Sequence, residues 1–148
     1  QVKEKESFEV YKGRKAYKTL IQSILLEKPK EWKGFGNLQV LREFPNEFPR
    51  WFRNVKIRLF STKTLEIAGL AKEATKTTKT VIKWLPKKVY MPIVWVIFGA
   101  NVLIIVYEPD IVILRIKSKA IVDSFSNQFD YLWKTDTAKE SKGGLTPK

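Results

Sequence analysis

Residues 89–117, VYMPIVWVIFGANVLIIVYEPDIVILRIK, decide the fold of this chain. They contain three apolar runs, at 93–98, 102–107 and 111–116, separated by Gly-Ala-Asn and by Glu-Pro-Asp. Isoleucine and valine dominate the runs, and β-branched side chains favour the pleated surface of a strand. Breaks made of Gly, Asn, Pro and Asp are typical of turns. The stretch therefore predicts three consecutive strands in the central part of one sheet.

A membrane-spanning helix is the alternative interpretation of this stretch. No charged residue lies between Lys88 and Glu108, which is close to the length of about 20 residues that a spanning helix requires. Pro92, the break at 99–101 and Arg115 within the next apolar run argue against a helix. We therefore expect a soluble domain in the cytoplasm, without a membrane partner.

The chain has 148 residues, of which 44% are hydrophobic, and this suits one domain with a proper core. It has no cysteine and no histidine. The commonest zinc ligands, the usual general base near neutral pH and every imidazole-dependent triad are therefore missing. We expect no metal, no cofactor and no enzymatic activity. A hydrolase built on Asp123 with Asp130, or on Glu43 with Glu47, is a weak alternative, because such helical acid pairs are usually solvated.

The formal net charge of +13 favours a polyanionic partner such as nucleic acid. A lysine-rich solvated surface, as in proteins from hot environments, would also explain it. If the surface binds nucleic acid, its contacts are to phosphates and carry no sequence information. The candidate residues for this alternative function are Lys72, Lys76, Lys79, Lys83, Lys87 and Lys88.

The remaining segments predict helices and strands on either side of the central stretch. Phe44, Phe48, Trp51 and Phe52 are expected to pack a helical segment at 38–54, which its two prolines interrupt. Further strands are expected at 8–11, 31–37, 55–60 and 80–85, and further helices from 14, at 64–78 and after a Ser118 N-cap. This order gives an α/β fold, a two- or three-layer sandwich with a mixed sheet of about seven strands.

Two glycines, Gly34 and Gly36, predict a tight turn at the end of the strand at 31–37. The alternative is a phosphate loop, but the third glycine of the dinucleotide motif and the lysine of the P-loop are both missing. For the chain as a whole we expect a linker at 1–7, one domain at 8–134 and a flexible tail at 135–148, because the tail has no apolar stripe.

Several segments together resemble the effector domains of archaeal TrmB-like transcriptional regulators, whose fold is related to the phospholipase D superfamily. The segments are FEVYKGRKAYKTLIQSIL, RWFRNVKIRLF, TVIKWLP, FGANVLIIVYEPDIVILRIKSK and KSKAIVDSFSNQFDYLWK. The resemblance implies a domain that follows an N-terminal winged helix, here missing, through which the regulator would bind DNA. It also implies a homodimer and, in some members, a small-molecule effector.

Phospholipase D enzymes carry the motif H-x-K-x-x-x-x-D on the strand that would correspond to 92–99. The resemblance places the histidine at Pro92, the lysine at Val94 and the aspartate at Gly99. None of these side chains can perform the corresponding step, so the phosphohistidine mechanism is excluded.

The principal hypothesis is therefore a non-catalytic regulatory domain that provides dimerisation and senses a small ligand by population shift. Any pocket is expected at strand ends, where an amide such as that of Asn37 can both donate and accept a hydrogen bond. The candidate ligand-binding residues are Gly36, Asn37, Arg53, Trp84 and Trp95. Each also has a plain structural explanation, as a turn residue, a solvated arginine or a core indole.

Overall fold

The computed structural model describes residues 5–86 and 93–143, with side chains as far as Thr135. The strands are β1 Ser7–Lys12, β2 Glu31–Gly36, β3 Lys56–Ser61, β4 Lys79–Trp84, β5 Val94–Phe98, β6 Asn101–Val106 and β7 Val112–Lys117. The helices are α1 Arg14–Leu25, α2 Gln39–Glu43, α3 Phe48–Trp51, α4 Leu65–Thr77 and α5 Lys119–Gly143.

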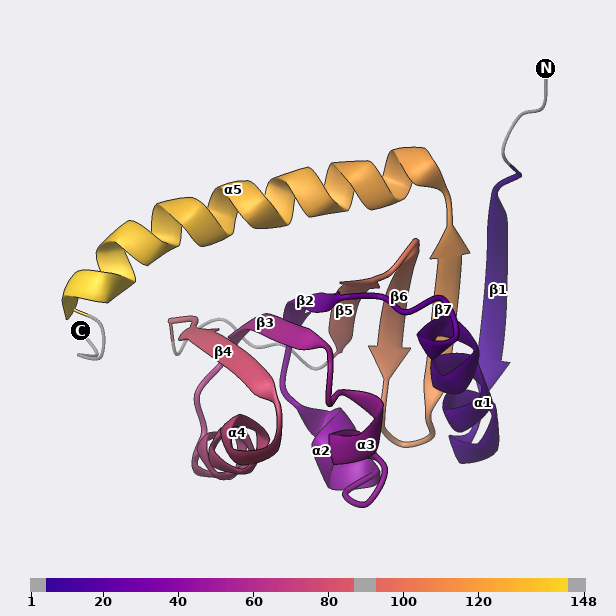
Figure 1. The fold of residues 1–148 in the computed structure, drawn as a ribbon, viewed down its shortest axis with the longest axis horizontal. Coiled ribbons are helices and arrows are strands. Elements are labelled where there is room, and N and C mark those ends of the chain that lie inside the picture. Colours follow the sequence, from indigo (N-terminus) through magenta and orange to yellow (C-terminus); the bar gives the residue numbers. More distant parts are fainter. Residues whose placement is uncertain (1–4, 87–92, 144–148) are drawn as a thin grey trace.

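One mixed sheet of seven strands, in the order β1-β7-β6-β5-β2-β3-β4, organises the molecule. Helices α1 to α4 lie on one face of the sheet, and α5 runs across the other (Figure 1). The predicted α/β sandwich with a mixed sheet of about seven strands is confirmed.

The central stretch folds as the predicted antiparallel meander β5-β6-β7. Gly99 makes the first turn with a φ of 64°, a left-handed conformation that costs glycine little. Among the described residues, none of the helices has both the length and the apolar character that crossing a bilayer requires.

The helical crossovers place β2, β3 and β4 in parallel register. The first strand differs from these three, because β1 is antiparallel to β7 at the far edge, with Phe8 opposite Ile116. Strand β2 already has β3 and β5 as neighbours, so no position beside it is left for β1.

Two glycines within β2 explain the contact between β2 and β5. Gly34 and Gly36 lie inside β2, so the predicted glycine turn is wrong in position. A Cβ at Gly34 would overlap the carbonyl oxygen of Trp95 on β5, and a Cβ at Gly36 would lie 3.0 Å from Val94 Cγ1. Both glycines therefore permit close packing of neighbouring strands.

Two apolar cores lie on the two faces of the sheet. The core under α1 to α4 contains the four aromatics that were predicted to pack the segment at 38–54, namely Phe44, Phe48, Trp51 and Phe52. The core under α5 includes Phe60, Ile97, Val102 and Phe129. Phe129 is completely buried and anchors α5 to the sheet.

Helix α5 begins where the sequence predicts. The hydroxyl oxygen of Ser118 accepts a hydrogen bond from the Ile121 amide at 3.3 Å, which confirms the N-cap. The helix continues past Lys134 to Gly143, so helical backbone occupies part of the segment that was predicted as a tail. Residues 1–4 of the predicted linker and 144–148 of that tail lie outside the described residues.

Candidate nucleic-acid interface

The N-terminal ends of β2, β3 and β4 lie together at one end of the sheet, because the three strands are parallel. Basic residues precede or begin every one of these strands, and all of them are exposed: Lys28, Lys30, Arg53, Lys56, Lys76 and Lys79. We call this set the basic end. Within the part of the chain that the structure describes, only Lys76 of the set forms an ion pair, with Glu73 at 3.5 Å.

Lys56 and Lys79 are neighbours within the basic end. They lie directly opposite each other in the register of β3 and β4, and adjacent strands are about 4.8 Å apart. The Lys56 amide also donates to the carbonyl oxygen of Lys30 at 2.9 Å, which brings a third lysine to the same place. Like charges directly opposite each other destabilise a sheet, and a bound anion would relieve that repulsion.

At the opposite end of the sheet two arginine side chains are neutralised by carboxylates. Arg42 forms ion pairs with Glu66 and, at 2.9 Å, with Glu108. The hydrogen bond to Glu66 is the largest cause that raises the pKa of Arg42. Arg14 pairs with Glu43 at 2.8 Å. Arg14 and Arg42 are therefore held in ion pairs, whereas Lys56 and Lys79 at the basic end form none within the described residues.

A second group of basic side chains lies between the sheet and α5. Lys33 Nζ on β2 donates to Asp130 Oδ1 of α5 at 2.9 Å, and Arg58 Nη2 on β3 reaches the same oxygen at 3.4 Å. Arg58 also donates to Glu31 through Nε. Both cations lie over the Phe129 ring, at 5.7 and 5.2 Å from its centroid. This group joins α5 electrostatically to the parallel half of the sheet.

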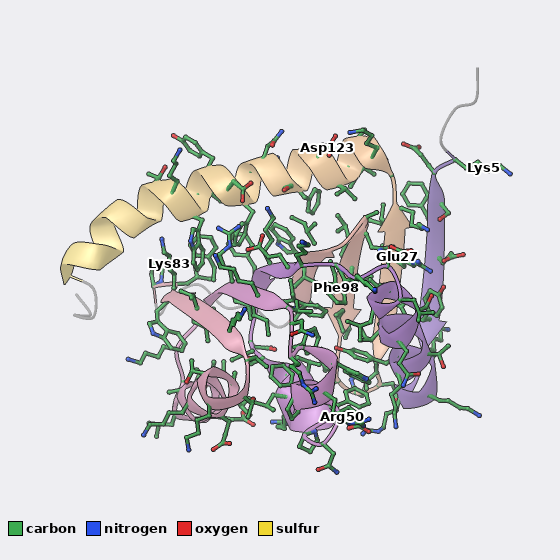
Figure 2. All side chains as sticks on the ribbon, in the orientation of Figure 1. Lys5, Glu27, Arg50, Lys83, Phe98 and Asp123 are labelled. Carbon is green, nitrogen blue, oxygen red and sulfur yellow. The ribbon has the colours of Figure 1, made fainter. Side chains whose placement is uncertain are left out.

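The lysines predicted as a nucleic-acid footprint occupy different environments. Lys72 and Lys76 are exposed on α4, and Lys79 belongs to the basic end. Lys83 is buried beneath α5 (Figure 2), where Nζ donates to the Trp133 carbonyl oxygen at 2.6 Å and lies 4.4 Å from the Trp133 ring centroid. The remaining two, Lys87 and Lys88, lie outside the described residues.

Three of the predicted ligand-binding residues come together at the C-terminal ends of the parallel strands. Gly36 and Trp84 are the last residues of β2 and β4, and both are in register with the buried Ser61 of β3. Asn37 follows Gly36, and its Oδ1 accepts a hydrogen bond from the Gln39 amide at 3.0 Å. The Asn37 side chain therefore supports the start of α2.

The other two predicted ligand-binding residues lie elsewhere. Trp95 on β5 belongs to the core under α5, where its ring centroid is 4.9 Å from that of Phe125. Arg53 lies at the basic end, at the opposite end of the sheet from Gly36. The structure therefore does not gather the predicted set into one site.

Two of the three positions that the resemblance assigns to the phospholipase D motif are structural residues. Val94 is 4% exposed and contacts Gly36. Gly99 forms the turn between β5 and β6. Pro92, the position of the nucleophile, lies outside the described residues.

The carboxylates considered for hydrolysis are each occupied by a cation. Asp123 pairs with Lys119 at 2.8 Å, whereas Asp130 pairs with Lys33 under α5. Glu43 and Glu47 pair with Arg14 and with a lysine of α1. Among the side chains that the structure describes, in 5–86 and 93–135, no group of acidic residues is arranged to hold a metal ion.

The inward position of Lys33 and Arg58 was missed from the sequence, although a signal was present. The alternation in β3 places Lys56, Arg58 and Phe60 on one face. Because Phe60 requires burial, its face had to be covered, and Arg58 had to lie under the same cover.

Comparison with known proteins supports the fold. No protein-family model and no curated protein sequence matches the chain. A solved structure of TrmBL2, an archaeal chromatin protein that shows a novel mode of DNA binding, is similar with a TM-score of 0.57 at 17% identity. NucT from Helicobacter pylori is similar with a TM-score of 0.56 at 11% identity.

The two matches differ in how much of the other chain they cover. The match with TrmBL2 covers 86% of this chain and 52% of TrmBL2, so this chain spans about half the length of that protein. The match with NucT covers 88% of this chain and 97% of NucT. At these identities the likeness establishes a shared fold.

Proposed function

We propose that this chain is a non-catalytic, nucleic-acid-associated domain of the TrmB-like, phospholipase D-like kind, and that it contacts backbone phosphates through the basic end. One observation carries the proposal. Exposed lysines and an arginine gather at the N-terminal ends of β2, β3 and β4, and only Lys76 among them forms an ion pair within the described residues, whereas Arg14 and Arg42 at the other end are paired. Lys56 lies opposite Lys79 on one side and opposite Glu31 on the other, and Glu31 is already bonded to Arg58.

The dimensions of the basic end suit a phosphate backbone. Three adjacent strands span about 10 Å, and a duplex carries one negative charge per about 1.7 Å of its axis. Contacts of this kind hold a protein on nucleic acid without reading bases. The fold is shared with TrmBL2, an archaeal chromatin protein that binds DNA, and this supports a nucleic acid as the partner.

The absence of enzymatic activity is part of the proposal. Neither Val94 nor Gly99 offers a charged or nucleophilic side chain at the positions of the phospholipase D motif, and the sequence has no histidine. Incubation of the chain with labelled duplex and single-stranded DNA should leave both intact. Cleavage by the purified chain would overturn this part.

A regulatory effector domain of a transcriptional regulator is the second candidate function. Phe8 and Val10 favour it, because they are 58% and 61% exposed on the edge strand β1 and offer an apolar surface to a second copy. Asn37 and Trp84, at strand ends on the opposite side of the sheet from the basic end, are the residues for a small effector in this case. Analytical ultracentrifugation tests it: a monomer at all concentrations would remove the dimerisation role.

Filter binding to duplex DNA at two salt concentrations tests the principal proposal. If every member of the basic end contacts a phosphate, log K should fall with log salt with a slope of up to about −5.4. Binding that is measurable at moderate salt and steeply salt-dependent would support the proposal. No binding at moderate salt would contradict it, and the lysines would then serve solubility alone.

A further inference from the structure

Under α5, one carboxylate of the helix lies between two cations of the sheet, next to the basic end. Asp130 Oδ1 receives Lys33 Nζ at 2.9 Å and Arg58 Nη2 at 3.4 Å. The two cationic side chains are only 11% and 17% exposed, whereas the Asp130 side chain is 52% exposed. The cations are therefore fixed by the sheet, and the carboxylate is the accessible partner.

We propose that Lys33 and Arg58 form an internal anion seat, which Asp130 occupies in the free protein and which a backbone phosphate enters when nucleic acid is bound. This inference rests on the proposed function. It adds a specific competitor to the binding surface, because Asp130 would lower the affinity for nucleic acid by occupying the seat. A phosphodiester, like the carboxylate, offers two oxygens and one negative charge to an arginine and a lysine.

The seat is continuous with the basic end. Lys56 and Arg58 are two residues apart on β3 and therefore lie on the same face. Their side chains start about 6.6 Å apart along the strand. Lys33 is directly opposite Arg58 in the register of β2 and β3. A strand of nucleic acid that binds Lys56 and Lys79 therefore has its next phosphate close to Arg58.

The structure also shows what keeps α5 in place when Asp130 moves away. Phe129 is fully buried, and the rings of Phe129 and Trp133 on α5 pack on Phe60 of β3 at centroid distances of 5.4 and 5.1 Å. These aromatic contacts do not involve Asp130. Release of the carboxylate needs only rotation of one exposed side chain, not detachment of the helix.

An exchange of this kind does not leave the buried cations uncompensated. Removing one partner of a buried ion pair is costly because the other charge stays unpaired. A phosphate that enters as Asp130 leaves maintains the compensation. Glu31 remains bonded to Arg58 in both states and holds its guanidinium in position.

The test compares Asp130→Asn with Asp123→Asn, which make the same change in net charge on the same helix. Asp123 lies on the outer face of α5 (Figure 2) and pairs with the exposed Lys119 at 2.8 Å. We expect Asp130→Asn to bind duplex DNA about tenfold more tightly at low salt, because one additional charge-assisted phosphate contact forms without competition. Its salt slope should be steeper by about 0.9. Asp123→Asn should change the affinity much less.

Three results decide the outcome. An equal effect of both substitutions would overturn the inference, because the Asp130 pair would then act only through net charge. In the unchanged protein, the Arg58 Nε–H signal and the Asp130 amide signal should shift during a titration with duplex DNA, measured by NMR. If the Arg58 and Asp130 signals stayed unchanged while those of Lys56 and Lys79 shifted, the inference would also be overturned. This readout holds even if Asp130→Asn fails to fold.

A separate measurement distinguishes the failure of this inference from the failure of the proposed function. If no form of the protein binds DNA, inorganic phosphate and pyrophosphate are added in a thermal denaturation experiment. Stabilisation of Asp130→Asn but not of Asp123→Asn would support the anion seat without a nucleic-acid partner. No stabilisation of either variant would overturn it.

Discussion

Replacement of Lys56 and Lys79 by glutamine should weaken nucleic-acid binding and at the same time leave the fold intact or slightly more stable. The two residues lie opposite each other on β3 and β4, and both are exposed. Neither forms an ion pair within the described residues. Their removal therefore breaks no ion pair and relieves a repulsion between like charges.

The magnitudes follow from the geometry. Relief of one exposed like-charge pair should raise the free energy of unfolding by about 0.2–0.5 kcal/mol, at the low end because water and salt screen it. Loss of two phosphate contacts should make the slope of log K against log salt shallower by about 1.8. The unchanged protein should bind more tightly than the variant at about 50 mM salt, and the ratio of the two binding constants should fall about 12-fold by about 200 mM salt.

The assay is filter binding over this salt range, combined with urea denaturation of the free proteins. The control is the double substitution Lys12→Gln and Lys15→Gln, which removes the same charge from exposed positions at the opposite end of the sheet. If the control weakened binding with the same change in slope, net charge alone would govern affinity. The assignment of the interface to the basic end would then be refuted.

Three further predictions concern the scaffold. Phe129→Ala should lower the free energy of unfolding by about 3–5 kcal/mol in a urea titration, because the ring is fully buried beneath α5; a loss below about 1 kcal/mol would contradict its role as anchor. Gly34→Ala should destabilise by at least about 3 kcal/mol, since the methyl group meets the main chain of Trp95; soluble, normally stable protein would argue against this strand contact. Burial raises the pKa of the Tyr17 and Tyr107 phenols, whose oxygens are 2.7 Å apart. The native state therefore keeps these protons, and stability should be complete below about pH 10 and fall as the pH rises above it. The double substitution of both tyrosines by phenylalanine should flatten that decline in urea titrations at several pH values, and an unchanged decline would contradict the assignment.

The elements with a strong local signal could be predicted from the sequence. The meander could be predicted because Gly99 and Pro109 interrupt runs of β-branched residues at strand-length intervals. Helix α5 could be predicted because Ser118 caps it and because Phe125 and Phe129 continue one apolar stripe. In each case the pattern within a few residues determines the structure.

The placement of β1 could not be predicted in this way. Its pairing with β7 depends on contacts between residues about a hundred positions apart, such as Phe8 with Ile116. Nothing in the local sequence states which edge of the sheet is free. The extent of α5 was missed for another reason, since its part beyond Lys134 has helix-forming residues but no apolar stripe.

The candidate site was harder to predict than the fold. The candidate nucleic-acid contacts were chosen from the positions of lysines in the sequence. That choice included both Lys79 and Lys83, of which only Lys79 is exposed. Selection of the basic end requires the register of β3 and β4 and knowledge of which acids neutralise which cations. The opposition of Lys56 and Lys79 is a property of the sheet that no segment of sequence contains.

The most direct measurement is an NMR titration of the ¹⁵N-labelled chain with a short DNA duplex at low salt. The amide signals that shift most should belong to the basic end, at Lys30, Lys56 and Lys79. Signals near Arg42, at the neutralised end of the sheet, should remain in place. Largest shifts around Arg42, or no shifts at a protein concentration well above that used for filter binding, would contradict the proposal that this sheet presents its basic end to nucleic acid.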